Sequence, residues 1–188
     1  MHETILCLKN PGKNAILWIM AFAVVIVHFV PLCAQQPSRP SNWNGWEFLL
    51  GDWIGEGGGN PGQGTGGFTF TQDLQKQILV RKNHAEFPAT ADRSAFSHDD
   101  LMIVYQDPPK PARAVYFDNE GHVIHYTAEF SKDRNTLTFI SDPIPSSPRF
   151  RMIYSKTSDK TLSIKFEIAP PGSPETFSTY LQSTAHRK

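Results

Sequence analysis

The sequence predicts an all-β fold: a closed antiparallel up-and-down β-barrel of about ten strands, preceded by a signal peptide and a short helical turn. Short runs of alternating apolar and polar residues follow one another along most of the chain, and the gaps between them are rich in Gly, Pro, Asn and Asp. No stretch longer than a turn shows the 3.6-residue period of a helix. Without crossover helices, neighbouring strands are expected to pair antiparallel.

The first 34 residues have the organisation of an export signal. Lys9 and Lys13 precede an apolar run over residues 15–30, and Ala34 leads into a polar segment. We expect cleavage after Ala34, giving a periplasmic or secreted protein. A retained anchor or a lipoprotein modified at Cys33 is the alternative, although the run is short for a bilayer core of about 30 Å. No stable membrane insertion is expected after cleavage.

Composition excludes several classes of function. Lys plus Arg number 18 and Asp plus Glu number 18, so binding to nucleic acid or to an anionic membrane is not expected. Both cysteines, Cys7 and Cys33, fall within the expected signal peptide. The mature domain would therefore contain no disulfide, no cysteine nucleophile and no cysteine metal ligand.

After the signal, residues 35–46 are polar and contain Pro, which predicts a disordered leader. The barrel domain is expected over residues 47–188 and opens with a helical turn around residues 46–49. Ten strands are then predicted at about residues 52–58, 66–74, 77–87, 99–107, 111–118, 122–130, 135–141, 149–156, 161–169 and 175–185.

The clearest alternation lies in the strand expected at residues 161–169. Its apolar residues occupy every second position from Leu162 to Ile168, so one face is buried and the other is wet. A meander of such strands removes its exposed edges by closing on itself. A barrel of ten strands is wider than the eight-stranded case that side chains just fill, so a cavity for one small ligand is expected.

Gly51 and Trp53 form a Gly-x-Trp motif at the entry to the first strand. The motif resembles the mark of the lipocalin-like (calycin) barrels, in which the Trp plugs one end. The longer stretch Gly-Asp-Trp-Ile-Gly-Glu-Gly, at residues 51–57, is similar to the opening of the nitrobindin-like family. The resemblance covers about residues 48–70 and implies a ten-stranded barrel that binds a ligand inside. Gly51 and Trp53 would form its end plug.

The same resemblance raises the question of haem. Nitrobindin-like proteins bind haem through a His in the final strand, and Tyr180 stands at the corresponding position here. A Tyr can ligate ferric haem, so Tyr180 is the possible haem ligand. Because the His itself is absent, no cofactor is expected.

Several polar residues interrupt otherwise good strands, and four of them are candidate ligand-binding residues: Arg81, Arg113, His125 and Tyr154. Facing inward, they would fix the polar or anionic head of a ligand while apolar residues hold the remainder. Facing outward, they would be ordinary solvent-exposed side chains. Their direction depends on the register of each strand.

No metal or catalytic motif stands out. The segment His98-Asp99-Asp100 is interpreted as the polar entry to a strand, because adjacent side chains point to opposite faces. No metal site is expected, and the chain lacks a Gly-x-Ser-x-Gly elbow.

The sequence therefore predicts an exported carrier or sensor of a small hydrophobic or amphipathic molecule. One alternative is a barrel-based enzyme such as an isomerase, with His125 or His84 as general base beside Glu86 or Glu129. Another is an interaction module whose interior is filled.

Overall fold

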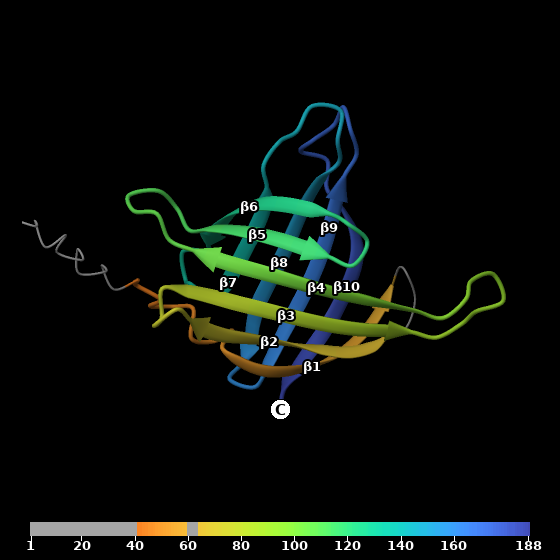
Figure 1. Cartoon of the computed structure of the whole chain (residues 1–188), viewed down its shortest axis with the longest axis horizontal. Helices are drawn as coiled ribbons and strands as arrows, with labels where there is room; N and C mark the ends of the chain where they lie inside the picture. The colour runs from red at the N-terminus through yellow and green to blue at the C-terminus, as the bar shows by residue number, and fades with distance from the viewer. Residues whose placement is uncertain (1–40, 60–63) are drawn as a thin grey trace, which may run out of the picture. The chain divides into compact units, whose positions relative to one another are not determined.

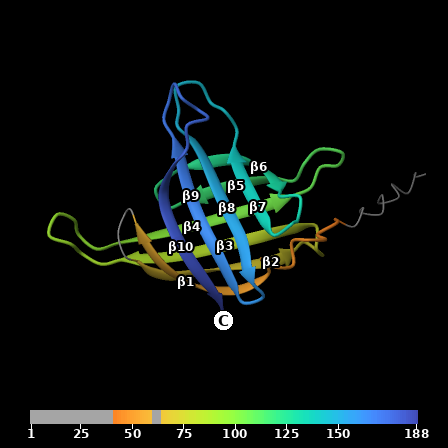
Figure 2. The same cartoon turned by 180° about the vertical axis from the view of Figure 1, so that it is seen from behind.

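The computed structural model describes residues 41–59 and 64–188 of the chain. Ten strands form one closed antiparallel sheet in the order β1-β10-β9-β8-β7-β6-β5-β4-β3-β2 (Figures 1 and 2). β1 closes the sheet because it pairs with both β2 and β10, with Trp53 opposite Phe68 on one side and Arg187 on the other. The expected closed barrel of ten antiparallel strands is confirmed. The expected signal peptide lies outside the described residues.

The ten strands are β1 (Gly51–Gly59), β2 (Thr65–Asp73), β3 (Ile78–Phe87), β4 (Phe96–Tyr105), β5 (Arg113–Asp118), β6 (Val123–Phe130), β7 (Thr136–Ser141), β8 (Arg149–Ser158), β9 (Thr161–Ala169) and β10 (Ser178–Arg187). The largest differences from the predicted boundaries are at β4, which begins at Phe96, and at β10, which begins at Ser178. At β4 the ladder with β3 continues beyond the barrel wall as a long hairpin, visible at the right of Figure 1.

The segment before β1 closes one end of the barrel, which we call the plug end. Leu49 N–H donates to the carbonyl of Trp46 and Leu50 N–H to that of Glu47, at 3.0 and 3.2 Å, which forms a turn. Trp43 and Trp46 are buried and pack edge to face at 5.3 Å. The packed part of the chain thus includes residues 41–46, ahead of the expected domain start. Two tryptophans three residues apart are the apolar anchors of this otherwise polar segment.

Trp53 on β1 is buried next to this segment, and three contacts hold its side chain. Its indole Nε1 donates to the carbonyl of Leu49 at 2.8 Å, its ring stacks on Phe68 at 6.1 Å, and the guanidinium of Arg187 lies 4.4 Å from its ring centre. Gly51, two residues earlier, adopts a φ of 117°, which a residue with a Cβ rarely does.

The half of the barrel next to the plug is solid. Its inward side chains are fully buried and include Leu49, Phe70, Leu79, Met102, Val104, Leu137, Phe139, Tyr154 and Leu162. Aromatic rings interlock across it, with Tyr154 edge-on to Phe70 at 5.7 Å and to Phe139 at 6.2 Å. This half of the interior is a packed core.

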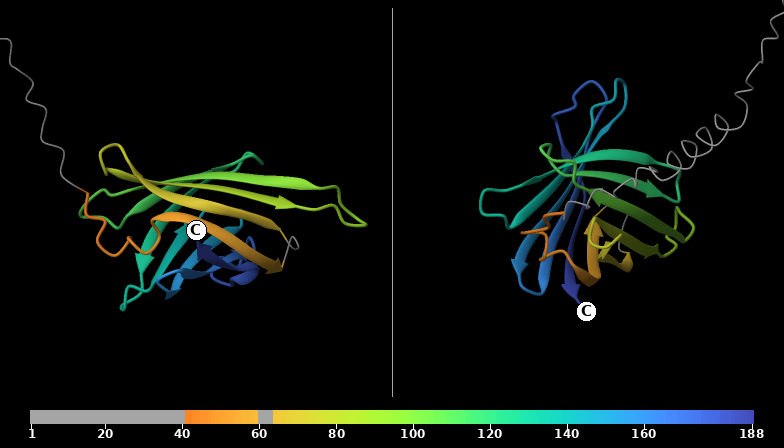
Figure 3. Two further views of the ribbon diagram at one scale, coloured as in Figure 1. Left: turned by 90° about the horizontal axis from the view of Figure 1, so that it is seen from below. Right: turned by 60° about the vertical axis from the view of Figure 1, so that its left-hand side comes forward.

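Two glycines let β2 pass very close to its neighbours. A Cβ on Gly66 would lie 2.1 Å from the carbonyl oxygen of His84, and one on Gly67 would lie 2.2 Å from that of Trp53. Neither space can hold a side chain, so β2 approaches β1 and β3 with its bare backbone. Figure 3 shows the curvature of β1 and β2 at this side of the barrel.

Replacing Trp53 tests the plug. We expect Trp53→Ala to lower the free energy of unfolding by about 3 to 5 kcal/mol, because it removes a large buried ring and leaves a cavity. The measurement is urea denaturation followed by circular dichroism. Phe117→Ala is the control, since the side chain of Phe117 is exposed and its loss should cost less than about 1 kcal/mol. Equal costs for the two variants would contradict a plug at Trp53.

Candidate functional site

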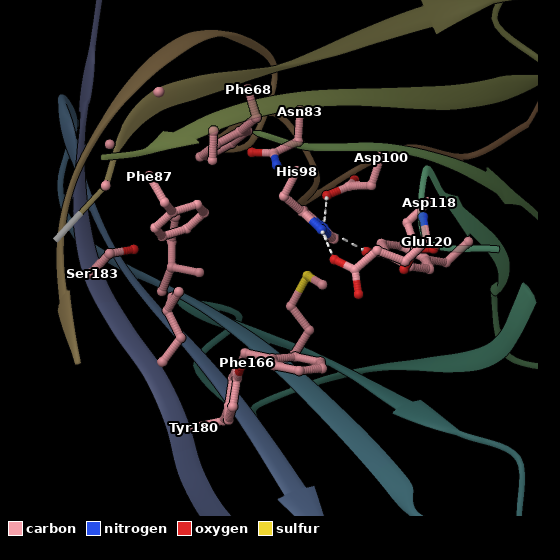
Figure 4. A pocket seen from close by; sticks show the side chains of 18 of the residues that line it. Phe68, Asn83, Phe87, His98, Asp100, Asp118, Glu120, Phe166, Tyr180 and Ser183 are labelled. Carbon is pink, nitrogen blue, oxygen red and sulfur yellow. Dashed lines mark hydrogen bonds and ion pairs between the residues drawn. The ribbon is translucent and has the colours of Figure 1, made fainter. Parts of the chain in front are cut away.

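The half of the barrel away from the plug is hollow. A cavity of about 610 Å³ extends from the solid half towards the opposite end, which we call the mouth end, where the β3–β4 hairpin and the β5–β6 loop leave the barrel (Figure 4). Its polar wall is formed mainly by β3, β4, β5 and the β5–β6 loop, and carries Arg81, Asn83, His98, Asp100, Tyr116, Asp118, Glu120 and His122. Its apolar wall is formed by β8, β9 and β10.

A buried ion pair lies at the bottom of the polar wall. Arg81 on β3 contacts Asp100 on β4, and the two side chains are only 7% and 3% exposed. The Arg81 guanidinium also lies 5.2 Å from the ring centre of Phe68. Burial, the largest single effect, opposes the charge on Arg81, but the negative charge of Asp100 together with the neighbouring tyrosines raises the pKa of the guanidinium.

His98 lies above this pair, towards the mouth end. Its Nδ1 lies 2.9 Å from the carboxylate of Glu120, and its Nε2 lies 3.0 Å from the hydroxyl of Tyr116 and 3.5 Å from Asp100. Figure 4 shows the ring between the two carboxylates. The hydrogen bond to Asp100 raises the pKa of His98 to about 9, against partial burial, which lowers it. His98 is therefore an imidazolium at neutral pH.

The β5–β6 loop holds Glu120 over His98 through a network around Asp118. One oxygen of Asp118 accepts the backbone N–H groups of Glu120 and His122, at 3.0 and 2.9 Å, and the other lies 2.8 Å from His122 Nδ1. Burial raises the pKa of the Asp118 carboxyl group, but the backbone and side-chain hydrogen bonds from His122 together lower it by more, so the net shift is downward.

Two buried donors on the polar wall lack a hydrogen-bond partner. They are Arg81 Nε and the hydroxyl of Tyr126, and Tyr126 is fully buried; a third such donor, Arg93 Nε, lines the cavity from the β3–β4 hairpin. Burial raises the pKa of Tyr126, so its hydroxyl stays protonated. Buried polar groups in folded proteins nearly always have partners, so the cavity holds unused hydrogen-bonding capacity.

The apolar wall is flat and aromatic. Phe150 on β8 and Phe166 on β9 stack in parallel at 5.9 Å, and Tyr180 on β10 packs edge-on against Phe166 at 6.1 Å. Met152 and Ile164 continue this wall towards the solid half. A ligand in the cavity would meet charged groups on one side and an apolar surface on the other.

Of the four candidate ligand-binding residues, Arg81 lies at the cavity and Tyr154 lies beneath it. Tyr154 is fully buried in the solid half, where its hydroxyl donates to the sulfur of Met152 at 3.0 Å. Burial raises the pKa of Tyr154 to about 12. Tyr154 thus supports the floor below Arg81.

Arg113 and His125 do not face the cavity, which corrects the expectation that they point inward. On β5 the inward positions belong to Ala114 and Tyr116, so Arg113 points outward and pairs with Asp142. On β6 Tyr126 points inward, so His125 is exposed. In each strand the next residue, Ala114 on β5 and Tyr126 on β6, takes the inward face, so Arg113 and His125 are turned outward.

The alternative general base His84 also lies on the outer face. It is half exposed and its Nδ1 lies 2.7 Å from Asp99. Glu86 and Glu129 are exposed as well. The geometry brings together one expected base and carboxylate pair, His84 and Glu86 at 3.4 Å, but on the outer face of the barrel and away from the cavity.

The sequence pattern did not reveal that His98 and Asp100 lie together on the cavity wall. The two residues flank Asp99 and are two positions apart, so they share one face of β4. That spacing was the available signal, since Met102 and Val104 continue the same face as apolar residues. Glu120 and Tyr116 could not be assigned, because their contacts with His98 depend on the pairing of β4 with β5.

The described part of the chain contains neither a metal-binding cluster nor a membrane-spanning helix. No group of three or more His, Cys, Asp or Glu side chains within residues 41–59 and 64–188 is placed to hold a metal ion. In the same ranges, no helix has the length and apolar character needed to cross a membrane.

Comparison with known proteins supports the fold. The crystal structure of Rv2717c from M. tuberculosis has a TM-score of 0.54 at 16% sequence identity, and the match covers 78% of this chain and 96% of that one. A weaker match is a structure of EF1p2_mFAP2b bound to DFHBI, with a TM-score of 0.41 and 8% identity; it covers 79% of this chain and 100% of that one. Another is a de novo designed fluorescence-activating beta barrel, with a TM-score of 0.39 and 9% identity; it covers 76% of this chain and 95% of that one. No family model and no curated protein matches this chain.

The raised pKa of His98 makes stability depend on pH. A histidine whose pKa rises on folding stabilises the protein fully below its unfolded pKa of about 6.5, and that contribution is lost as pH rises through the folded value. We therefore expect the free energy of unfolding to fall by about 1 to 3 kcal/mol between pH 6.5 and 9.5, as measured by urea denaturation.

His98→Gln should flatten this decline, whereas His125→Gln should leave it unchanged because His125 is exposed. An equally steep decline in His98→Gln would show that another group causes it.

Proposed function

We propose that this protein is an exported carrier or sensor of a small, largely apolar molecule with a polar head. The single observation that carries the proposal is the cavity of about 610 Å³ with one charged and hydrogen-bonding wall and one aromatic wall. Small-molecule sites are typically concave and mostly apolar, with a few convergent polar groups that orient the ligand. The cavity matches that description.

The energetics of such binding are favourable. Burial of apolar surface contributes about 25 cal/mol per Å², so a ligand that buries about 300 Å² on the wall of Phe150 and Phe166 gains at most about 7.5 kcal/mol before association costs. Micromolar binding requires about 8.2 kcal/mol net, so this apolar contribution does not reach it alone and an oriented polar contact must add to it. The polar wall supplies that contact through Arg81, which the buried Asp100 holds in place.

Export is proposed from the apolar run over residues 15–30 and the small residue Ala34. N-terminal sequencing of the protein recovered from the periplasm or the culture medium tests it. A mature chain beginning at Gln35 would support cleavage, and a full-length chain in the cytoplasmic fraction would contradict export.

The nitrobindin-like alternative implies haem held by Tyr180. Tyr180 does line the cavity, but it is 40% exposed, it packs against Phe166, and within the described residues no hydrogen bond orients its hydroxyl. His98, the other possible ligand on the cavity wall, already contacts Tyr116, Asp100 and Glu120. These residues do not fit haem, and a Soret band after haem addition would overturn this conclusion.

An isomerase is not favoured by the geometry either. A histidine that acts as general base must be unprotonated at working pH, whereas the carboxylates around His98 raise its pKa to about 9. His84 and His125 lie on the outer face, away from the cavity.

A matched pair of tryptophan variants tests the cavity as the binding site. Ser183 on β10 lines the cavity, while its neighbour Gln182 points outward and is exposed. We expect Ser183→Trp to fill the space and to weaken binding of the neutral fluorescent probe N-phenyl-1-naphthylamine by about tenfold or more. Gln182→Trp should bind within about twofold of the parent protein.

Native mass spectrometry of the same two variants provides a second measurement. A ligand that co-purifies with the parent protein should persist in Gln182→Trp and disappear in Ser183→Trp. If both variants bind the probe as the parent does, binding occurs outside the cavity and the proposal fails.

A further inference from the structure

We propose that the polar wall selects a neutral carbonyl oxygen, which accepts hydrogen bonds from Arg81 Nε and from the hydroxyls of Tyr126 and Tyr116. The ligand class is then a flat, apolar ketone or a related uncharged carbonyl compound, and not a carboxylate. This inference rests on the proposed function and names the chemistry of its ligand head.

The first support is the pair of unpartnered donors. Arg81 is 6% exposed and Tyr126 is fully buried, yet neither Arg81 Nε nor the Tyr126 hydroxyl has a hydrogen-bond partner. Leaving a buried donor without a partner costs about 1 to 3 kcal/mol. Both residues line the cavity, but the two donor atoms are themselves covered, so an acceptor atom of a ligand would satisfy these unused donors once the side chains around them adjust.

The second support is the state of Tyr116. Its hydroxyl oxygen lies 3.0 Å from His98 Nε2. With His98 protonated on both nitrogens, Nε2–H donates to this oxygen or to Asp100. Tyr116 then has its own hydroxyl hydrogen free to donate to another group. The rings of Tyr116 and Tyr126 meet edge to face at 6.3 Å, so the two hydroxyls belong to one part of the wall.

Both tyrosines remain donors at neutral pH. Burial, followed by the nearby negative charge of Asp100, raises the pKa of Tyr116. Burial also raises the pKa of Tyr126. Neither hydroxyl therefore ionises in the range where the protein is folded and functional.

The third support is the charge balance of the wall, which disfavours a charged head. Arg81 is paired with Asp100, the imidazolium of His98 lies beside Glu120, and the carboxylate of Asp118 lies 2.8 Å from His122 Nδ1. The side chains of Asp100 and Asp118 are only 3% and 4% exposed. A carboxylate placed here would be an uncompensated charge close to two buried carboxylates. A cationic head would meet Arg81 and His98.

The opposite wall fits a flat skeleton. Phe150 and Phe166 are nearly parallel, with an angle of 9° between their rings, and offer one continuous face to an aromatic or conjugated ligand. A flat carbonyl compound lying on this face can present its oxygen to the polar wall.

Three naphthalene probes that differ only in their substituent test the proposal. 2-Acetylnaphthalene carries a neutral carbonyl, 2-naphthoate a carboxylate and 2-ethylnaphthalene no polar group. By isothermal titration calorimetry on the full folded domain, we expect the ketone to bind about tenfold or more tightly than either of the other two. The infrared carbonyl stretch of the bound ketone should shift to lower frequency as it accepts hydrogen bonds.

Tyr126→Phe identifies the donor. It removes a hydroxyl that has no partner in the folded chain, so the variant should fold with unchanged or greater thermal stability. Its affinity for 2-acetylnaphthalene should fall about tenfold, and its affinity for 2-ethylnaphthalene should stay within about twofold of the parent value. Tyr105→Phe is the control, because the Tyr105 hydroxyl lies beside Arg113 on the outer face, and both affinities should stay unchanged.

The outcomes separate the two proposals. Tighter binding of 2-naphthoate, or a ketone preference that survives in Tyr126→Phe, overturns the carbonyl site while leaving the ligand-binding cavity intact. If neither the ketone nor 2-ethylnaphthalene binds up to its solubility limit, the cavity takes no apolar ligand of this size, and the proposed function fails together with the inference.

Discussion

The buried ion pair of Arg81 and Asp100 is the interaction on which the interior depends, because it marks where the solid half of the barrel ends. Below it, Tyr154 and its aromatic neighbours pack to full burial. Above it, the same sheet encloses a cavity. A buried charge needs its partner close by, so Asp100 fixes Arg81 at the boundary between the packed core and the cavity.

Much of the fold could be predicted because strand periodicity and turn residues are local properties of the sequence. The alternation from Leu162 to Ile168 and the Gly-x-Trp at Gly51 and Trp53 both indicate the barrel without any knowledge of contacts. Trp43 and Trp46 were harder to assign to the domain, because their burial depends on contacts with the turn between β2 and β3 and with Phe130 of β6 rather than on their own polar segment.

The candidate site was only partly predictable, for a physical reason. In strands where polar and apolar residues mix, a shift of one position reverses the face of every side chain. Arg81 could be identified as a candidate because it belongs to a polar run within a strand, where one residue of each alternating pair must face inward. Arg113 looks equivalent in sequence, but its outward position and its contact with Asp142 follow from strand register. The link from His98 to Glu120 joins β4 to a loop 22 residues later in the chain, so no local pattern reveals it.

The central claim is that Arg81 and the two tyrosines beside it form the polar end of a binding cavity. The most direct test is the ¹H–¹⁵N resonance of Arg81 Nε, followed by NMR during titration with 2-acetylnaphthalene. The account predicts that this resonance shifts on saturation and that nuclear Overhauser contacts connect the ligand to Phe150 and Phe166. An unmoved Arg81 resonance, with shifts confined to residues on the outer face, would contradict it.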